Sequence, residues 1–152
     1  MMTVETTRFG QVEVDEGKLL VFPRGLLGFP LQKRYALMQT GVNSAFYWLQ
    51  AVDRPELAFV VTDPRLFLPD YKAPAKAEDL KQLDLTDAEE AQVFVIVNKV
   101  DGLLTGNLQG PLMINATSRV GKQLVLSDKR FSTRYPLMQL PAAVPAAASR
   151  SA

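Results

Sequence analysis

Short runs of apolar and β-branched residues, separated by proline and glycine, recur along most of this chain. Residues 57–62 form a continuous apolar run, which indicates a central strand buried on both faces. Residues 93–97 are the strongest strand signal in the sequence. Residues 46–52 alternate, so Phe46 and Trp48 share one face of the predicted strand. The pattern predicts about eight to ten short strands, the others being residues 3–8, 11–14, 18–22, 34–39, 112–116 and 122–126.

Helical signals are confined to one part of the chain. Residues 76–83 predict a short helix with Leu80 and Leu83 on its apolar side. Residues 86–89 match the Ser/Thr-x-x-Glu pattern of a capping box, so a second helical turn is expected to begin at Asp87. Many short strands with this one helical insertion favour an antiparallel β architecture over a βαβ fold.

The fold class predicted by this pattern is mainly β: a small antiparallel β-barrel-like domain with one or two short helices inserted. Asp101 and Gly102 form a hairpin signal within it. We expect the domain to span residues 1–137. Residues 138–152, rich in proline and alanine, are expected to form a disordered tail.

The composition narrows the functional classes. The 152 residues suffice for one domain with a real core, and the formal net charge of +1 excludes a strongly basic nucleic-acid binder and a strongly acidic phosphate mimic. The chain has no cysteine and no histidine. It therefore lacks a disulfide framework, a thiol nucleophile and the commonest transition-metal ligand, and we expect neither cofactor nor metal.

The chain also lacks membrane and export signals. No apolar stretch approaches the roughly 20 residues that span a bilayer. The first ten residues do not follow the basic-then-apolar order of a signal peptide. We therefore expect a cytoplasmic protein that does not associate with a membrane.

Few side chains could carry chemistry. Four carboxylates lie near the aromatic residues, and a pair of them could do acid–base work if burial separated their pKa values. Turns beside Pro55 and Pro64 explain Asp53 and Asp63 better, because aspartate in a turn bonds to its own backbone. We predict no catalytic residue; the four are Asp53, Glu56, Asp63 and Asp70.

Two short motifs each have a structural and a functional interpretation. Gly25-x-x-Gly28 lacks the further glycines, lysine and helix of a phosphate-binding loop, so a tight apolar turn is favoured. Asn107 and Asn115 flank Gly110-Pro111 and could hold a partner's backbone. Satisfying exposed backbone groups at a turn is the favoured role for each asparagine.

Aromatic residues on an irregular segment indicate a contact surface. Phe67, Pro69 and Tyr71 lie in residues 65–72, which show no clear periodicity. Exposed aromatic anchors are enriched at protein interfaces. We expect Phe67 to fill the end of the core and Tyr71 to be at least partly exposed.

The last segment before the tail is basic. It could be a nucleic-acid patch, or a solvated face that guides an acidic protein partner. Five cationic residues over sixteen positions are a weak signal for nucleic-acid binding. Since the net charge of the chain is only +1, the rest of the chain must be net acidic. The residues are Arg119, Lys122, Lys129, Arg130 and Arg134, interleaved with Phe131 and Tyr135.

The order and spacing of several short motifs resemble the FliW family of flagellar assembly factors. The resemblance covers roughly positions 4 to 137, and the order of the motifs is more specific than any one of them. They are Phe22 to Phe29 (FPRGLLGF), Trp48-Leu49-Gln50, Leu57 to Val61, Asp63-Pro64, Pro69-Asp70-Tyr71, Asn107-Leu108, Pro111, Ile114-Asn115 and Gln123.

The resemblance implies a cytoplasmic, non-catalytic regulator that works by partner exchange, a chaperone of one protein and a regulator of translation. The family's partners are flagellin, bound before export, and the RNA-binding translational regulator CsrA. The chain would be a monomer when free and would not bind nucleic acid directly. We expect its partner contacts at Tyr71, Phe67, Pro69, Phe46 and Asn107.

The near-neutral charge adds a constraint on how CsrA would be antagonised. A competitor for the RNA site of a basic regulator is expected to carry strong negative charge. We therefore expect antagonism from beside the RNA site, by allostery or by steric exclusion of RNA at one edge.

Two other functional classes remain as alternatives. A single-stranded RNA-binding β-barrel protein would use Phe46, Trp48, Tyr71 and the basic segment, and would need its aromatic and basic residues on one face. A hydrolase would need two carboxylates facing each other in a concave pocket. The sequence gives the hydrolase no support.

Overall fold

The computed structural model describes residues 1–41 and 44–140. Within these ranges it contains eleven strands, the α-helix α1 (Ala77–Gln82) and three 3-10 helices, η1 (Glu16–Lys18), η2 (Pro64–Leu66) and η3 (Ala88–Glu90). The strands are β1 (Met2–Thr6), β2 (Gly10–Val14), β3 (Leu20–Val21), β4 (Arg34–Gln39), β5 (Phe46–Ala51), β6 (Ala58–Thr62), β7 (Gln92–Val100), β8 (Leu103–Gly106), β9 (Leu112–Ile114), β10 (Gly121–Gln123) and β11 (Tyr135–Gln139).

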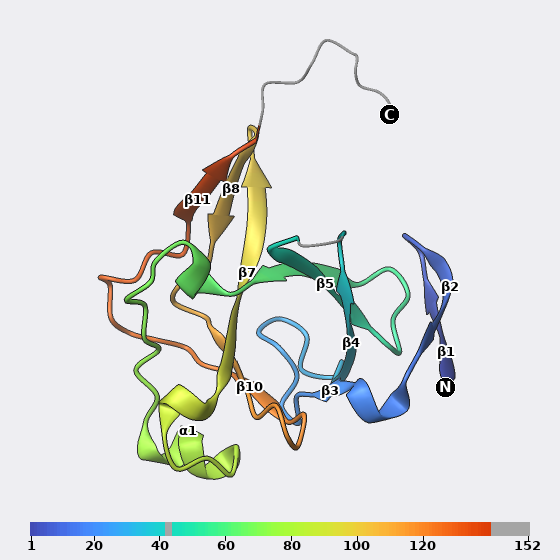
Figure 1. Ribbon diagram of the computed structural model, residues 1–152, viewed down its shortest axis with the longest axis horizontal. Helices are drawn as coiled ribbons and strands as arrows, with labels where there is room; N and C mark the ends of the chain where they lie inside the picture. Colours follow the sequence, from blue (N-terminus) through green and yellow to red (C-terminus); the bar gives the residue numbers. More distant parts are fainter. Residues whose placement is uncertain (42–43, 141–152) are drawn as a thin grey trace.

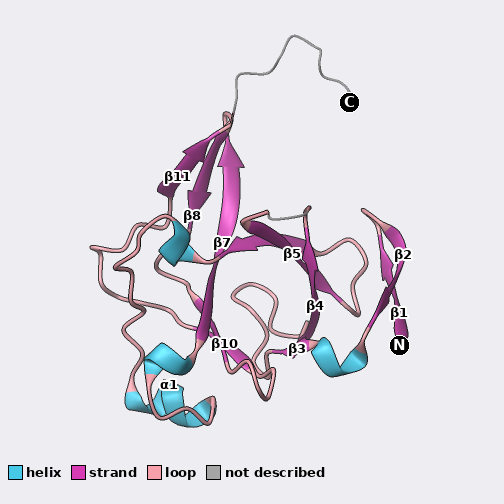
Figure 2. Ribbon diagram, in the orientation of Figure 1, coloured by secondary structure: helices cyan, strands magenta, loops and turns pink. Residues whose placement is uncertain are grey.

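One curved antiparallel sheet dominates the structure (Figures 1 and 2). Its strands follow the order β10-β9-β7-β6-β5-β4-β3, while β8 pairs with both β7 and β11. The hairpin of β1 and β2 forms a separate two-stranded sheet, and it lies beside the loop between β5 and β6, where Thr7 N donates to Pro55 O at 2.9 Å. The prediction of a mainly β fold with a short helical insertion is confirmed.

The sheet stops short of closing into a barrel. Its first and last strands meet at one parallel bridge between Val21 and Val120, where Val21 N donates to Arg119 O at 2.9 Å. Beyond Val21 the chain enters a turn at Pro23, which has no N–H for a ladder. The edge of β10 past Val120 is therefore left without a neighbouring strand from β3.

Two apolar clusters lie on opposite sides of β7. Phe94 points to the cluster inside the curved sheet, with Tyr35 and Leu49 among its fully buried members. Val93 and Val95, alternate residues of the same strand, point to a second cluster under α1 and the following loops. The prediction that residues 93–97 form a strand is confirmed, and the structure buries that strand on both faces.

Local signals predicted most elements. Residues 34–39 form β4 as expected, and α1 occupies the predicted helix with Leu83 buried at its end. Asp101 and Gly102 have φ values of 51° and 80°, the left-handed conformations of the predicted hairpin turn.

Three expectations were wrong in detail. Residues 18–22 yield only the two-residue β3, because η1 takes up the preceding residues. The capping box lies one residue later than predicted: Asp87 caps η3, and Glu90 accepts from Asp87 N at 2.9 Å. β11 was not predicted, since Pro136 breaks its pattern; as an edge strand it tolerates that proline.

The described structure extends past the predicted end of the domain. β11 continues to Gln139, past the predicted domain end at residue 137. Residues 141–152, most of the predicted tail, lie outside the described residues. Among the residues that are described, no helix has the length and apolarity needed to cross a membrane.

Candidate functional site

The outer face of β5 carries the first part of a candidate contact surface. Tyr47 and Leu49 point inward, and the Tyr47 ring lies 5.7 Å from that of Phe94 in the core. Alternation along the strand therefore places Phe46 and Trp48 on the opposite, outer face, as predicted. Both side chains are only partly buried there.

Two other segments extend these rings into a row. The Phe67 ring lies 6.0 Å from Phe46, and the Phe9 ring lies 5.9 Å from Trp48. The Arg8 guanidinium sits 4.2 Å above the Trp48 ring, a cation–π contact. Phe9 is 47% exposed and Leu66 is 63% exposed. We call this set the aromatic surface: Phe9, Phe46, Trp48, Leu66 and Phe67.

The local sequence explains the position of Phe67. The Asp63 carboxylate accepts from Arg65 N at 2.9 Å and caps η2, whose first position is proline. The turn is closed by Phe67 N, which donates to Pro64 O at 3.1 Å. This tight turn leaves Leu66 in solvent and lays Phe67 against β5.

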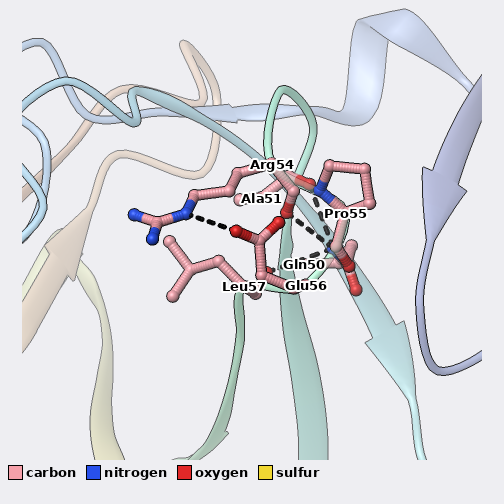
Figure 3. A network of polar contacts seen from close by, with 6 residues as sticks. All are labelled: Gln50, Ala51, Arg54, Pro55, Glu56 and Leu57. Atoms are coloured by element: carbon pink, nitrogen blue, oxygen red, sulfur yellow. Dashed lines mark hydrogen bonds and ion pairs between the residues drawn. The ribbon is translucent and has the colours of Figure 1, made fainter.

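A buried glutamine holds the other end of the aromatic surface (Figure 3). Gln50 is fully buried, and its Nε2 lies 3.1 Å from each of the carbonyl oxygens of Ala51, Pro55 and Leu57. The loop it fixes receives the β1–β2 hairpin, because Thr7 N donates to Pro55 O at 2.9 Å. Gln50 thereby supports the turn that carries Arg8 and Phe9.

The expected burial of two candidate residues is reversed. Tyr71 is 7% exposed rather than partly exposed, and its hydroxyl donates to Leu108 O at 3.0 Å. Burial raises the pKa of Tyr71 to about 12. Phe67, expected in the core, is only partly buried on the aromatic surface, while Pro69 is exposed as a contact residue requires.

The asparagines have the turn roles that the sequence favoured. Asn107 Oδ1 accepts from Gln109 N and Gly110 N at 3.0 and 3.2 Å. Asn115 Oδ1 accepts from the backbone N–H groups of its own turn, and its Nδ2 donates to Leu83 O at 2.9 Å. These bonds place Asn107 in the turn at Gly110, to which Gln123 of β10 also donates.

The carboxylates near the aromatic residues form local ion pairs. Asp53 pairs with Arg34 at 2.8 Å, and Glu56 pairs with Arg54 at 2.8 Å. Asp63 serves as a cap, as described above. Within residues 1–41 and 44–140, no group of three or more aspartates and glutamates is arranged to hold a metal ion. These contacts give the carboxylates structural roles.

The basic segment does not join the aromatic surface. Arg130 pairs with Asp128 at 2.7 Å, and Lys122 pairs with Asp79 at 2.5 Å. Phe131 packs edge-on against the buried Tyr71, with ring centroids 5.6 Å apart. Of the aromatic residues named for an RNA reader, Tyr71 therefore lies beside the basic segment but is buried, where it cannot stack on a base.

A groove of about 840 Å³ runs along β10 and is a second candidate site. One wall is the loop of residues 23–30, where Leu27 N donates to Gln123 Oε1 at 2.7 Å. The other wall is α1, joined to β10 by the Lys122–Asp79 pair. Gln123 Nε2 also donates to Gly110 O at 3.0 Å. Three motifs of the sequence therefore meet at this groove: the loop of residues 23–30, Gln123 and Gly110-Pro111.

The Lys122–Asp79 pair is expected to make stability depend on pH. Burial pushes the pKa of Asp79 upward, but hydrogen bonds from Lys122 Nζ and Lys76 N outweigh it, so the pKa lies below its ordinary value. The folded chain then binds fewer protons than the unfolded chain. The stabilisation is present above the unfolded pKa, roughly 3.9, and is lost as the pH falls through the folded value.

We therefore predict that Lys122→Gln costs about 1.5–3 kcal/mol at pH 7 and much less near pH 3. Urea unfolding at both pH values measures this. Lys129→Gln, at an exposed lysine, is the matched control and should cost little at either pH. A Lys122→Gln penalty that stays constant between pH 7 and pH 3 would contradict the assignment.

Comparisons with known proteins agree on one family. A family model described as FliW protein matches residues 3–137. The chain is 39% identical over 140 residues to the flagellar assembly factor FliW of Magnetococcus marinus, covering 90% of this chain and 85% of that protein. It is 37% identical over 153 residues to the flagellar assembly factor FliW of Geobacter sulfurreducens, covering 99% and 96%.

The fold is also similar to a solved structure. A crystal structure of the flagellar assembly factor FliW matches with a TM-score of 0.80 and 31% sequence identity. The match covers 90% of this chain and 97% of that chain.

Proposed function

This chain belongs to the FliW family, and from that premise we propose that it is a non-catalytic flagellar assembly factor that binds flagellin in the cytoplasm. When flagellin leaves, the freed chain antagonises the translational regulator CsrA. The chain thus acts as a chaperone of one partner and, through the other, as a regulator of translation. Besides the family, the aromatic surface is the observation that supports this proposal.

The aromatic surface suits a helical partner. Flagellin's terminal regions are amphipathic helices, and such helices lay an apolar face onto a hydrophobic surface. A row of aromatic rings with Leu66 projecting at one end supplies anchors of the kind that dominate interface energetics. We therefore assign Phe46, Phe67 and Pro69 to the flagellin contact, and add Trp48 and Phe9.

Antagonism of CsrA is proposed to act from beside its RNA site. The chain has a net charge of only +1 and so does not imitate the polyanion that a basic regulator binds. A competition titration tests this. RNA affinity for CsrA should fall to a limiting value as the chain saturates, whereas unlimited displacement at one shared site would contradict the proposal.

A first experiment separates protein partners from RNA. The tagged full chain is used to capture its partners from a cytoplasmic lysate, and bound proteins are identified by mass. Flagellin should be recovered, and CsrA should replace it when flagellin is depleted. Recovery of RNA without either protein would instead favour the single-stranded RNA alternative.

We predict that Phe67→Ala weakens flagellin binding about 30-fold, because an aromatic anchor at an interface contributes about 2 kcal/mol or more. Calorimetric titration measures the affinity. Trp48 is the single tryptophan, so a change in its emission on binding reports contact at the aromatic surface. Leu31→Ala, at an exposed leucine outside this surface, should leave the affinity unchanged.

Two controls make the Phe67→Ala result decisive. The variant must keep the thermal unfolding transition of the parent chain within a few degrees, since Phe67 is only partly buried. Unchanged affinity in a folded Phe67→Ala chain, with no shift of Trp48 emission on adding flagellin, would place the contact elsewhere.

A further inference from the structure

The groove beside β10 exposes backbone as well as side chains. Leu124 N donates to Pro111 O and Leu126 N donates to Gln109 O, each at 2.8 Å. These bonds continue the antiparallel ladder in which Gly121 pairs with Ile114. In such a ladder, residues that bond inward alternate with residues whose N–H and C=O point to the opposite edge. The backbone groups of Gln123 and Val125 therefore face the groove.

The groove walls flank this edge without covering it. Side chains of neighbouring strand residues point to opposite faces, so Gln123 reaches the loop of residues 23–30 while Lys122 reaches α1. The walls thus cover the two faces of β10, and the opening lies along the edge between them. Val125 is 73% exposed at this opening.

The groove beside β10 is open because the sheet does not close into a barrel. β3 meets the residue just before β10 at one bridge, Val21 to Val120, and the chain then turns away at Pro23. The space that a further strand would occupy beside residues 121–126 is the groove itself. Edge strands in native proteins are usually short, charged or covered, because an open edge pairs readily with another chain.

We propose that an extended segment of a protein partner adds as a strand to this edge. The backbone groups of Gln123 and Val125 supply its hydrogen bonds, and alternate side chains of the segment enter the apolar walls around Leu26 and Leu83. The segment has no proline at its pairing positions. This mode of binding is separate from the contact of a helix with the aromatic surface.

The charges that line the groove favour an acidic segment. Lys122 and Asp79 neutralise each other. Of the other charged residues along the described groove, Arg24 and Lys76 are cationic and Glu78 is anionic. A segment with net negative charge is therefore preferred over one with net positive charge.

The test uses two substitutions at one residue. Val125→Pro removes an N–H that faces the groove and makes no internal bond, whereas Val125→Ala keeps it. The probe is a blocked eight-residue peptide of alternating valine and glutamate, followed by fluorescence anisotropy with the full chain. The peptide should bind the parent and Val125→Ala chains, and binding to Val125→Pro should be about tenfold weaker or more.

Further arms separate strand addition from other binding. The same peptide with lysine in place of glutamate should bind more weakly, and one with proline at alternate positions should not bind. In the parent chain, the peptide should slow hydrogen exchange at the amides of Gln123 and Val125, a readout that does not depend on a variant folding. No saturable binding up to about 1 mM, equal binding by Val125→Pro, or no added amide protection would overturn the proposal.

Discussion

Gln50→Glu is expected to destabilise the chain by about 3–5 kcal/mol at neutral pH, the cost of an uncompensated buried charge. The Gln50 Nε2 atom donates toward the carbonyls of Ala51, Pro55 and Leu57 and is fully buried. An ionised carboxylate in its place has no hydrogen to donate, and its negative charge would face these carbonyl oxygens. Figure 3 shows these bonds between the Gln50 amide and the surrounding backbone.

The sign of the pH dependence follows from that environment. Burial among carbonyl oxygens raises the pKa of the introduced carboxyl above its unfolded value, roughly 4.3. The folded variant then binds more protons than the unfolded one, so its stability falls as the pH rises from the unfolded pKa toward the folded one. Urea unfolding at pH 4.5 and pH 8 should show the larger loss at pH 8.

Gln50→Met is the matched control, with similar shape and no charge. It loses the donors but also removes Oε1, which has no hydrogen-bond partner in the described structure. We expect a cost of about 1–2 kcal/mol that does not vary with pH. Equal losses for the two variants at pH 8 would show that the introduced charge adds no cost, which would contradict the predicted penalty for a buried carboxylate.

Gln50→Glu should also disturb the aromatic surface. Gln50 fixes the carbonyl of Pro55 that receives Thr7 N, and the β1–β2 hairpin carries Phe9 onto Trp48. Loosening of the loop should expose the Trp48 ring and shift its emission to longer wavelength. This links a buried amide to the proposed flagellin contact.

Gly25→Ala is the second large effect, with an expected loss of at least about 3 kcal/mol from backbone overlap and strain. Gly25 has φ +66°, and a Cβ there would lie 2.4 Å from Phe29 O and 2.6 Å from Pro30 Cα. Both contacts are with backbone, so no side-chain rotation relieves them. The loop would have to open, taking with it the Leu27 bond to Gln123 at the groove.

Gly28→Ala separates strain from overlap. Gly28 has φ +88° and nothing within 4 Å of an added Cβ. It should therefore cost about 1–2 kcal/mol, the price of a left-handed residue alone. Urea unfolding of both variants measures the difference, and a Gly25→Ala loss no larger than that of Gly28→Ala would contradict the tight backbone approach.

Local patterns in the sequence determined the elements and the family. The apolar run of residues 93–97, the Asp101-Gly102 turn and the helix before Leu83 depend on neighbouring residues, so sequence reasoning found them. Alternation along β5 likewise placed Phe46 and Trp48 on one face. The order of short motifs was sufficient to identify the family that the comparisons confirm.

Only the tertiary structure decided which of these residues meet. Tyr71 is buried because Leu108 and Phe131, far along the chain, supply its hydrogen-bond acceptor and its packing. Phe9 and Leu66 were missed because their neighbours on the aromatic surface come from other segments. The open edge of β10 depends on where β3 turns away. Burial and contact are set by partners distant in sequence, and a pattern read along one segment carries no information about which distant segments will pack against it.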